Sequence, residues 1–306
     1  MTRPRPIDLL IVAGFLGAGK TSLLAHLLAT AGDRRLAVMV NEWSRHDVDG
    51  DRLQAPGRAI DRISGGSIFC HCRAATLQRT LDDLLDRRSP PDAILVEASG
   101  LADPSTLPGL LAELGRCDRL RPRVITLVHP LTLGKVLPSL PATAGQLRAA
   151  DLIVCNHCDH CSDRAVTMCL DLIREFAPTT PLYRSDHGRV DWSVLTATSR
   201  ASHVCTEESV TAKPAVLDAE LQPPAGSDLT EWLAQISRHF GQTLLRAKGQ
   251  LYGPAGPEQI DWDGHRWQRR PLPEPAATAN RLIVLLATTS RDRLFRFQQE
   301  QAAGNA

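Results

Sequence analysis

The sequence predicts an α/β fold, in which a mostly parallel sheet carries helices on both faces and a smaller α+β domain follows. Short apolar runs alternate with stretches of helical periodicity through the first two thirds of the 306 residues. Within these runs apolar and polar residues do not strictly alternate, which is typical of strands buried on both faces of a parallel sheet. From about residue 198 the chain becomes polar and proline-containing before helical periodicity returns. This change indicates a linker and a second domain.

The first domain is predicted to be residues 1–198. Its expected strands, all short and apolar, are 8–13, 36–40, 93–96, 124–128 and 152–155. Its expected helices, in which apolar residues recur three and four positions apart, are 22–28, 74–87, 105–114 and 163–176. Strands and helices in this alternation form the βαβ pattern of a parallel sheet.

A linker over 199–227 is predicted to join this domain to a second one over 228–306. The polar run that ends at Asp228 indicates a linker that is followed by a helix, with Asp228 as the N-terminal cap. The segments expected after the cap are a helix at 229–240 and strands at 243–251, 265–269 and 280–287. A helix followed by several strands indicates an α+β unit.

Composition excludes several classes of partner. Hydrophobic residues make up 43% of the chain and charged residues 23%, and the formal net charge is +1, so no electrostatic footprint for nucleic acid or an anionic membrane is present. The apolar run near the N-terminus is too short to span a membrane and lacks a cleavage site. We therefore expect a cytoplasmic protein. The eight cysteines, several one to three residues apart, suit reduced thiols or metal ligands better than disulfides.

A glycine-rich loop follows the first expected strand. Gly14–Thr21 fits the pattern G-x-x-x-x-G-K-[ST], in which successive backbone N–H groups point into one concavity that suits a di- or triphosphate. The following helix adds the positive end of its dipole. Lys20 is expected to reach the β- and γ-phosphates, and Thr21 to supply a hydroxyl to Mg²⁺. The residues predicted to hold the nucleotide here are Gly14, Gly17, Ala18, Gly19, Lys20, Thr21 and Ser22.

Two further segments complete the predicted site of a P-loop NTPase. Glu97 ends the strand 93–96, where an acidic residue is expected to hold a water bound to Mg²⁺, and Gly100 is placed to sense the terminal phosphate. Later, Asn156-His157-Cys158-Asp159 resembles the N-K-x-D segment of P-loop GTPases.

The carboxylate of that later segment determines the predicted choice of base. Asp159 can accept hydrogen bonds from guanine N1–H and the N2 amine, a donor pair that adenine lacks, so GTP is the predicted nucleotide. His157 replaces the lysine of the pattern, and its imidazole could stack on the base. Ser185–Gly188 could present backbone N–H groups to guanine O6.

A cluster of soft ligands overlaps the base-recognition segment. Cys155, Cys158 and Cys161 show C-x-x-C-x-x-C spacing, which by itself could hold zinc or an iron–sulfur cluster. Asn156 and Asp159 already have roles in nucleotide binding, and a metal would compete for the same loop. We therefore interpret these cysteines as thiols incidental to a nucleotide-binding loop.

Several segments together resemble the CobW-type GTPases, a metallochaperone class allied to the nickel-insertion GTPases of urease and hydrogenase maturation. The matching segments are Gly14–Thr21, Asn41–Trp43, Asp49–Gly50, Glu97–Pro104, Gln146–Asp151 and, in the second domain, Leu245–Gly249. The resemblance implies GTP binding with slow hydrolysis and switching loops that report the nucleotide state. It also implies delivery of a transition metal, typically zinc, cobalt or nickel, to a client metalloprotein or cofactor-assembly enzyme.

The sequence departs from the family where the metal would be held. The family's G-C-x-C-C motif corresponds to Gly66–Cys70, in which Ser67 and Phe69 replace two cysteines, and Arg45 replaces an acidic residue. His129 likewise stands where the family commonly has Asp. A relocated transition-metal site is one hypothesis, and partly buried inert thiols are the alternative. The residues of the relocated site are Glu42, Cys70, His71 and Cys72.

The leading hypothesis is therefore a GTPase in which Lys20, Thr21, Glu97 and Gly100 bind and slowly cleave Mg²⁺-GTP in support of metal delivery or metalloenzyme maturation. No arginine finger is identifiable, so a client or a second copy in a homodimer is expected to complete the site. One rival is a GTP-switched chaperone that handles no metal, favoured by Ser67, Phe69 and Arg45. A second rival is an ATP-dependent small-molecule kinase. Asp159 disfavours it, because the predicted base recognition selects guanine.

Overall fold

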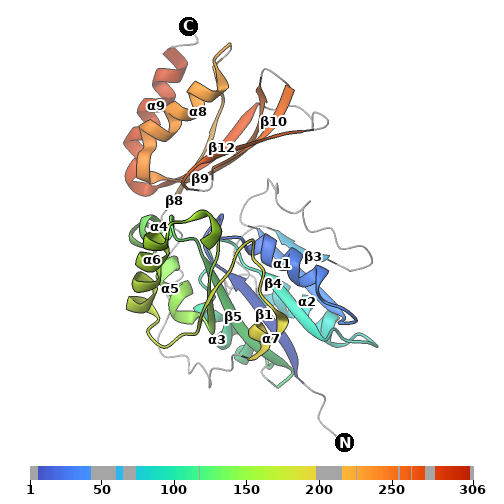
Figure 1. Ribbon diagram of the computed structural model, residues 1–306. Coiled ribbons are helices and arrows are strands. Elements are labelled where there is room, and N and C mark those ends of the chain that lie inside the picture. The colour runs from blue at the N-terminus through green and yellow to red at the C-terminus, as the bar shows by residue number, and fades with distance from the viewer. Residues whose placement is uncertain are drawn as a thin grey trace, which may run out of the picture. The chain divides into compact units, whose positions relative to one another are not determined.

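The computed structural model shows two compact units that divide near residue 212 (Figure 1). It describes residues 6–42, 60–64, 74–116, 118–197, 216–224, 226–253, 256–262, 264–272 and 280–303. The first unit holds a parallel sheet and the second an antiparallel sheet. The predicted fold class, a parallel α/β unit with a smaller α+β unit, is confirmed. The predicted domain limits at 198 and 228 stay a prediction.

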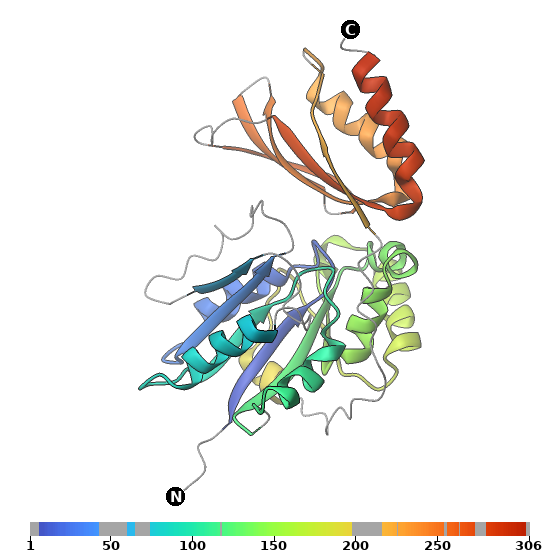
Figure 2. The same cartoon turned by 180° about the vertical axis from the view of Figure 1, so that it is seen from behind.

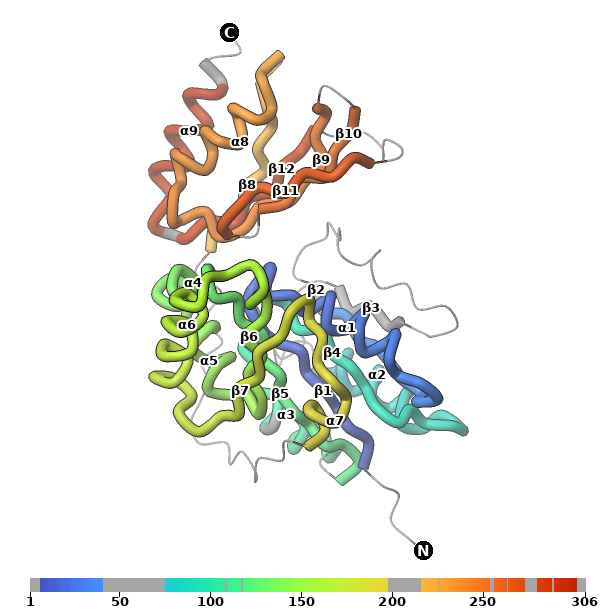
Figure 3. The backbone as a smooth tube through the Cα atoms, viewed as in Figure 1, coloured from blue at the N-terminus to red at the C-terminus, as the bar shows by residue number. Residues whose placement is uncertain are grey.

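The first unit is built on a seven-stranded sheet with the order β3-β2-β4-β1-β5-β6-β7. Every pairing in it is parallel. The strands are β1 (Ile7–Ala13), β2 (Leu36–Glu42), β3 (Ile60–Ser64), β4 (Ala93–Glu97), β5 (Leu120–Val128), β6 (Leu152–Cys155) and β7 (Leu182–Arg184). The carboxyl ends of β1, β4, β5 and β6 therefore lie along one edge of the sheet, where open α/β sheets bind ligands (Figure 3).

Helices cover both faces of this sheet, as predicted (Figure 2). They are α1 (Lys20–Ala29), α2 (Ala74–Leu85), α3 (Leu107–Glu113), α4 (Leu133–Ser139), α5 (Pro141–Ala149), α6 (Asp163–Phe176) and α7 (Trp192–Ala197). Leu9 and Ile11 of β1 pack in one apolar cluster with α2 and α3, whereas Leu10 and Val12 pack in another with α1 and α7. Alternate residues of a strand point to opposite faces, so β1 is buried on both sides.

The second unit is a five-stranded antiparallel sheet with the order β11-β10-β9-β12-β8. Its elements are β8 (Val216–Leu221), α8 (Leu229–Phe240), β9 (Leu244–Gly253), β10 (Gly256–Trp262), β11 (Trp267–Pro271), β12 (Arg281–Ala287) and α9 (Arg291–Ala303). Apolar residues of both helices, among them Trp232, Phe240 and Phe297, share one cluster with the sheet. Asp228 caps α8 by accepting a hydrogen bond of 2.8 Å from the backbone N–H of Glu231.

The structure contains elements that the sequence analysis did not predict. Val216–Leu221, inside the stretch predicted as a linker, forms strand β8 and pairs with β12. The strands β3, β7 and β10 and the helices α4, α7 and α9 were also missed, and only the end of α5 was expected, from the family resemblance of Gln146–Asp151. Among the residues that the structure describes, no helix is both long and apolar enough to cross a membrane.

Candidate functional site

The loop between β1 and α1 depends on three glycines. Gly14, Gly17 and Gly19 have φ angles of 126°, 82° and 100°, a region that glycine enters at little cost. A Cβ on Gly14 would lie 2.2 Å from the carbonyl oxygen of Leu127 in β5, and one on Gly19 would lie 2.1 Å from Nδ2 of Asn156. The loop is therefore curved and pressed against β5 and the segment after β6, which is the shape that a phosphate-binding loop requires.

We expect Gly14→Ala to lower the free energy of unfolding by about 2 kcal/mol more than Gly32→Ala, because the new methyl group must displace a strand backbone. Gly32 is the matched control, since it also has positive φ, 57°, but a Cβ there meets no atom within 4 Å. Urea unfolding of both variants measures the difference. Equal destabilisation would show that the collision with Leu127 is relieved without cost.

Lys20 lies at the start of α1 and is 6% exposed. Its Nζ donates hydrogen bonds to the carbonyl oxygens of Gly14, at 3.0 Å, and Phe15, at 3.3 Å. The ammonium group is thus held within the loop, at the place where the anionic part of a nucleotide is predicted to bind.

Thr21 and Glu97 meet beside this loop. The Thr21 hydroxyl donates a hydrogen bond of 2.9 Å to Oε1 of Glu97, the last residue of β4, which pairs in the sheet with Val12. Hydroxyl and carboxylate oxygens are ligands that Mg²⁺ accepts. The residues present therefore fit a magnesium-bound nucleotide, because the two predicted oxygen donors are adjacent at the mouth of a glycine loop.

The segment after β4 contacts the same loop. A Cβ on Gly100 would lie 2.7 Å from the backbone nitrogen of Leu16, so this glycine allows the close approach. Nε2 of the buried Gln146 in α5 donates to the carbonyl oxygens of Ala102, at 2.8 Å, and Gly100, at 3.3 Å. The predicted sensor of the terminal phosphate is thus linked directly to α5.

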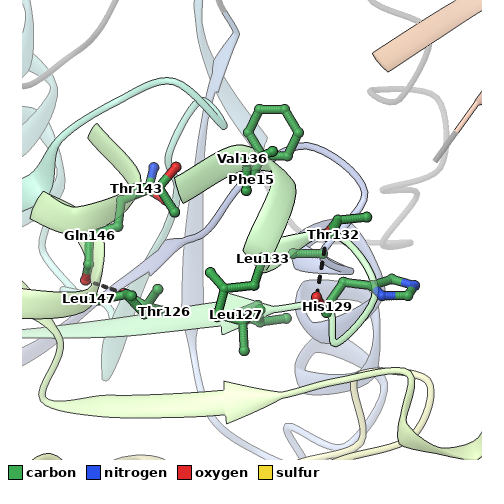
Figure 4. A pocket seen from close by; sticks show the side chains of 12 residues that line it. Phe15, Thr126, Leu127, His129, Thr132, Leu133, Val136, Thr143, Gln146 and Leu147 are labelled. Atoms are coloured by element: carbon green, nitrogen blue, oxygen red, sulfur yellow. Dashed lines mark hydrogen bonds between the residues drawn. The ribbon is translucent and has the colours of Figure 1, made fainter. Parts of the chain in front are cut away.

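Gln146 also accepts a hydrogen bond at its backbone carbonyl from the hydroxyl of Thr126, at 2.8 Å, beside a small pocket between β5, α4 and α5 (Figure 4). Both side chains are almost fully buried. The sequence analysis did not single out this pair. A threonine inside the apolar run of β5 was the available signal, because a buried hydroxyl needs a hydrogen-bond partner.

Asn156 joins three parts of the predicted base site. It is completely buried, and its Nδ2 donates to the carbonyl oxygen of Ala18 at 2.9 Å, while its Oδ1 accepts from the backbone N–H of Gly188 at 2.9 Å. The glycine loop, the end of β6 and the loop at 185–188 are therefore connected by one side chain. The structure also brings Asp159 to the 185–188 loop, since its backbone N–H donates to Oδ1 of Asp186 at 2.9 Å.

His157 has a left-handed backbone, with φ of 62°, and its ring stacks on that of His129, with 4.7 Å between centroids and 25° between planes. His129 is buried, and its Nδ1 accepts a hydrogen bond of 3.1 Å from the backbone N–H of Leu131. The two histidines that replace family residues are thus in contact. The sequence analysis expected the His157 ring to stack on the base and did not predict its contact with His129. His129 follows a neighbouring strand of the sheet, and spacing along the chain does not show that the two residues meet.

The cysteines near β6 pack with apolar residues in the cluster that also holds Val166 and Cys169 of α6. The sulfur atoms of Cys155 and Cys158 are 3.8 Å apart. A hydrogen bond with Cys169, together with burial, raises the pKa of Cys155. Burial raises the pKa of Cys158 to about 12 and that of Cys161 to about 11. In the absence of metal these thiols therefore stay protonated near neutral pH, and their packing in an apolar cluster favours their interpretation as packing residues.

Most residues of the hypothetical relocated transition-metal site lie outside the residues that the structure describes. Glu42 ends β2, but its side chain is not described, and Cys70, His71 and Cys72 fall between the described ranges 60–64 and 74–116. That site stays a prediction.

Comparison with known proteins identifies relatives of this chain. It is 32% identical to the zinc chaperone YeiR of Escherichia coli over 188 residues, which covers 60% of this chain and 57% of YeiR. It is 26% identical to the zinc chaperone YjiA of the same organism over 278 residues, or 85% of this chain and 86% of YjiA. The crystal structure of Zn(II)-bound YjiA GTPase superposes with a TM-score of 0.49 at 20% identity and covers 96% of this chain and 99% of that one.

A family model described as CobW/HypB/UreG, nucleotide-binding domain, matches residues 8–184, which is more than half of the chain. The match begins in β1 and ends in β7, so it includes the glycine loop, Glu97 and the segment Asn156–Asp159. The chain therefore belongs to the CobW/HypB/UreG family.

Proposed function

We propose that this protein binds Mg²⁺-GTP at the edge of the parallel sheet, hydrolyses it slowly and uses the nucleotide to control delivery of a transition metal, zinc foremost, to a client protein. The contact between Thr21 and Glu97 is the observation on which the proposal depends. It joins the glycine loop to β4, and it places two oxygen ligands of the kind that Mg²⁺ accepts 2.9 Å apart. The family membership supports the same function.

Each residue of the site has one proposed task. Lys20 exchanges its carbonyl partners for phosphate oxygens, and the backbone N–H groups of the loop bind the remaining oxygens. Asn156 holds the loop against the base-recognition segment, and Asp159 accepts the two guanine donors. Bound Mg²⁺ would supply neutralisation of phosphate charge, with Thr21 and Glu97 as its protein partners.

We propose slow hydrolysis because positioning of the nucleotide and neutralisation of its charge are the only catalytic contributions that can be identified in the sequence. An arginine supplied by a client or by a second copy of the chain would accelerate it. We propose that the protein acts in the cytoplasm, where reduced cysteines persist.

Metal delivery is favoured over a chaperone that handles no metal, because the relatives YeiR and YjiA are both named zinc chaperones. The proposed ligands for the cargo are Cys70, His71 and Cys72, with Glu42 approaching from the end of β2. They offer the thiolate, imidazole and carboxylate donors that zinc prefers.

Phosphate release from GTP and zinc stoichiometry, measured on the same preparation, test the proposal. We expect magnesium-dependent release that ATP does not replace, and bound zinc whose affinity changes when GTP is present. Cys70→Ser with Cys72→Ser should remove one zinc equivalent and leave GTP binding unchanged, whereas the control Cys205→Ser should change neither. GTP turnover with no zinc bound more tightly than about micromolar would favour the chaperone without metal, and absence of GTP binding would reject both.

A further inference from the structure

Asp159, His160 and His187 place three metal-ligating side chains together at the surface. Oδ2 of Asp159 lies 3.0 Å from Nε2 of His160 and 3.3 Å from Nε2 of His187. Within the part of the chain that the structure describes, this is the one group of three or more histidine, cysteine or acidic residues whose ligand atoms all lie within 4.8 Å of one another. We name it the Asp–His–His cluster.

The cluster is held by contacts between two loops. Asp159 and His160 follow β6, whereas His187 follows β7. The backbone N–H of Asp159 donates to Oδ1 of Asp186 at 2.9 Å, which fixes the two loops beside each other. His187 is also held in the left-handed region, with φ of 56°. Such a conformation costs about 1 kcal/mol or more in a residue other than glycine, so the surrounding contacts hold the backbone of His187 in place.

The donor set and its spacing suit a borderline transition metal. Two imidazoles and one carboxylate, with water in the fourth position, is a ligand set of open zinc sites, and imidazole donors disfavour Mg²⁺ and Ca²⁺. Ligands at tetrahedral zinc distances are about 3.4 Å apart, close to the two separations measured here. The side chains of Asp159, His160 and His187 are 25%, 49% and 59% exposed, so an ion can reach them from solvent.

We infer that the Asp–His–His cluster is a second transition-metal site, and that metal and guanine compete for the carboxylate of Asp159. The site itself stands on the geometry of the three side chains, whereas the competition rests on the proposed function. A carboxylate oxygen bound to a metal ion cannot also accept the hydrogen bonds of guanine N1–H and the N2 amine with full strength. Metal at this position therefore weakens nucleotide binding, and nucleotide weakens metal binding by the same factor.

The experiment uses the full chain and measures zinc stoichiometry by equilibrium dialysis, without nucleotide. The variant is His160→Gln with His187→Gln, which keeps polar side chains of similar length. The control is His26→Gln with His239→Gln, two histidines from α1 and α8 outside the cluster. We expect the variant to bind one zinc equivalent fewer than the parent and the control to bind the same number. Equal stoichiometry in variant and parent overturns the site, and thermal unfolding of both verifies that they are folded.

A second measurement addresses competition, with the affinity for GDP determined by calorimetry at fixed excess Mg²⁺, with and without zinc. We expect zinc to raise the dissociation constant of the parent and the control by about tenfold or more, and to raise that of the His160→Gln, His187→Gln variant by a clearly smaller factor, whereas an equal rise in the variant would overturn the competition. A parent that binds GDP equally well with and without zinc overturns the competition. If the parent binds no GDP even without zinc, the proposed function fails, while the dialysis result still decides the metal site.

Discussion

Lys20→Ala is expected to raise the dissociation constant for Mg²⁺-GTP by about 100-fold or more. The buried ammonium group, which donates to the carbonyl oxygens of Gly14 and Phe15, is the only side-chain cation within the glycine loop sequence Gly14–Thr21. On nucleotide binding we expect it to exchange these neutral acceptors for phosphate oxygens. Each charge-assisted hydrogen bond contributes about 1.5–3 kcal/mol, so loss of two costs about 3 kcal/mol or more, equivalent to the stated change in affinity.

Calorimetry on the parent, Lys20→Ala and the control Lys135→Ala measures this effect. Lys135 lies in α4, outside the glycine loop, so its removal should leave the affinity within about twofold of the parent. Circular dichroism and thermal unfolding establish that the variants are folded. GTP binding by Lys20→Ala as tight as that of the parent would show that the loop does not hold the phosphates.

The sequence was most informative where local chemistry fixes both ends of an element. The helix predicted at 163–176 has those limits in the structure, because Ser162 caps it by accepting a hydrogen bond from the backbone N–H of Ala165 and its apolar stripe is regular. The helix at 229–240 agrees for the same reason, with Asp228 as its cap. By contrast, β3 carries charged residues between its apolar ones, and β7 has only three residues, so neither gives a clear apolar run.

In the candidate site, too, features set by the local sequence could be predicted, whereas contacts between distant parts of the chain could not. The glycine loop and Glu97 follow apolar runs, and parallel strands place their carboxyl ends at one edge, so their proximity could be predicted. The contact of Asn156 with Gly188, the stack of His157 on His129 and the support of Gly100 by Gln146 join residues far apart in the chain. Spacing along the sequence carries no information about such contacts. The left-handed backbone of His187 could not be predicted either, because this position holds neither glycine nor asparagine.

Asp159→Asn is expected to change the preferred base from guanine to xanthine. The carboxylate of Asp159 offers two acceptor oxygens, which match the N1–H and N2 amine donors of guanine. An asparagine amide offers one acceptor and one donor, so its donor faces a guanine donor, whereas xanthine has a carbonyl oxygen in place of the N2 amine. One hydrogen bond to a charged group is lost and the other is weakened to a hydrogen bond with a neutral oxygen, and since a hydrogen bond to a charged group contributes about 1.5–3 kcal/mol, we expect the GDP affinity to fall by about 100-fold.

The same variant should bind xanthosine diphosphate more tightly than the parent does, by a factor of about 100. This gain separates base recognition from general damage, because a misfolded loop cannot acquire a new ligand. Asp163→Asn is the control, since it makes the same chemical change at an exposed position four residues later, at the start of α6. Calorimetry with guanosine, xanthosine and adenosine diphosphates, with transition metals removed by chelation, gives the three affinities. Unchanged preference for guanosine diphosphate in Asp159→Asn would assign base recognition to another group and would leave Asp159 to the Asp–His–His cluster alone.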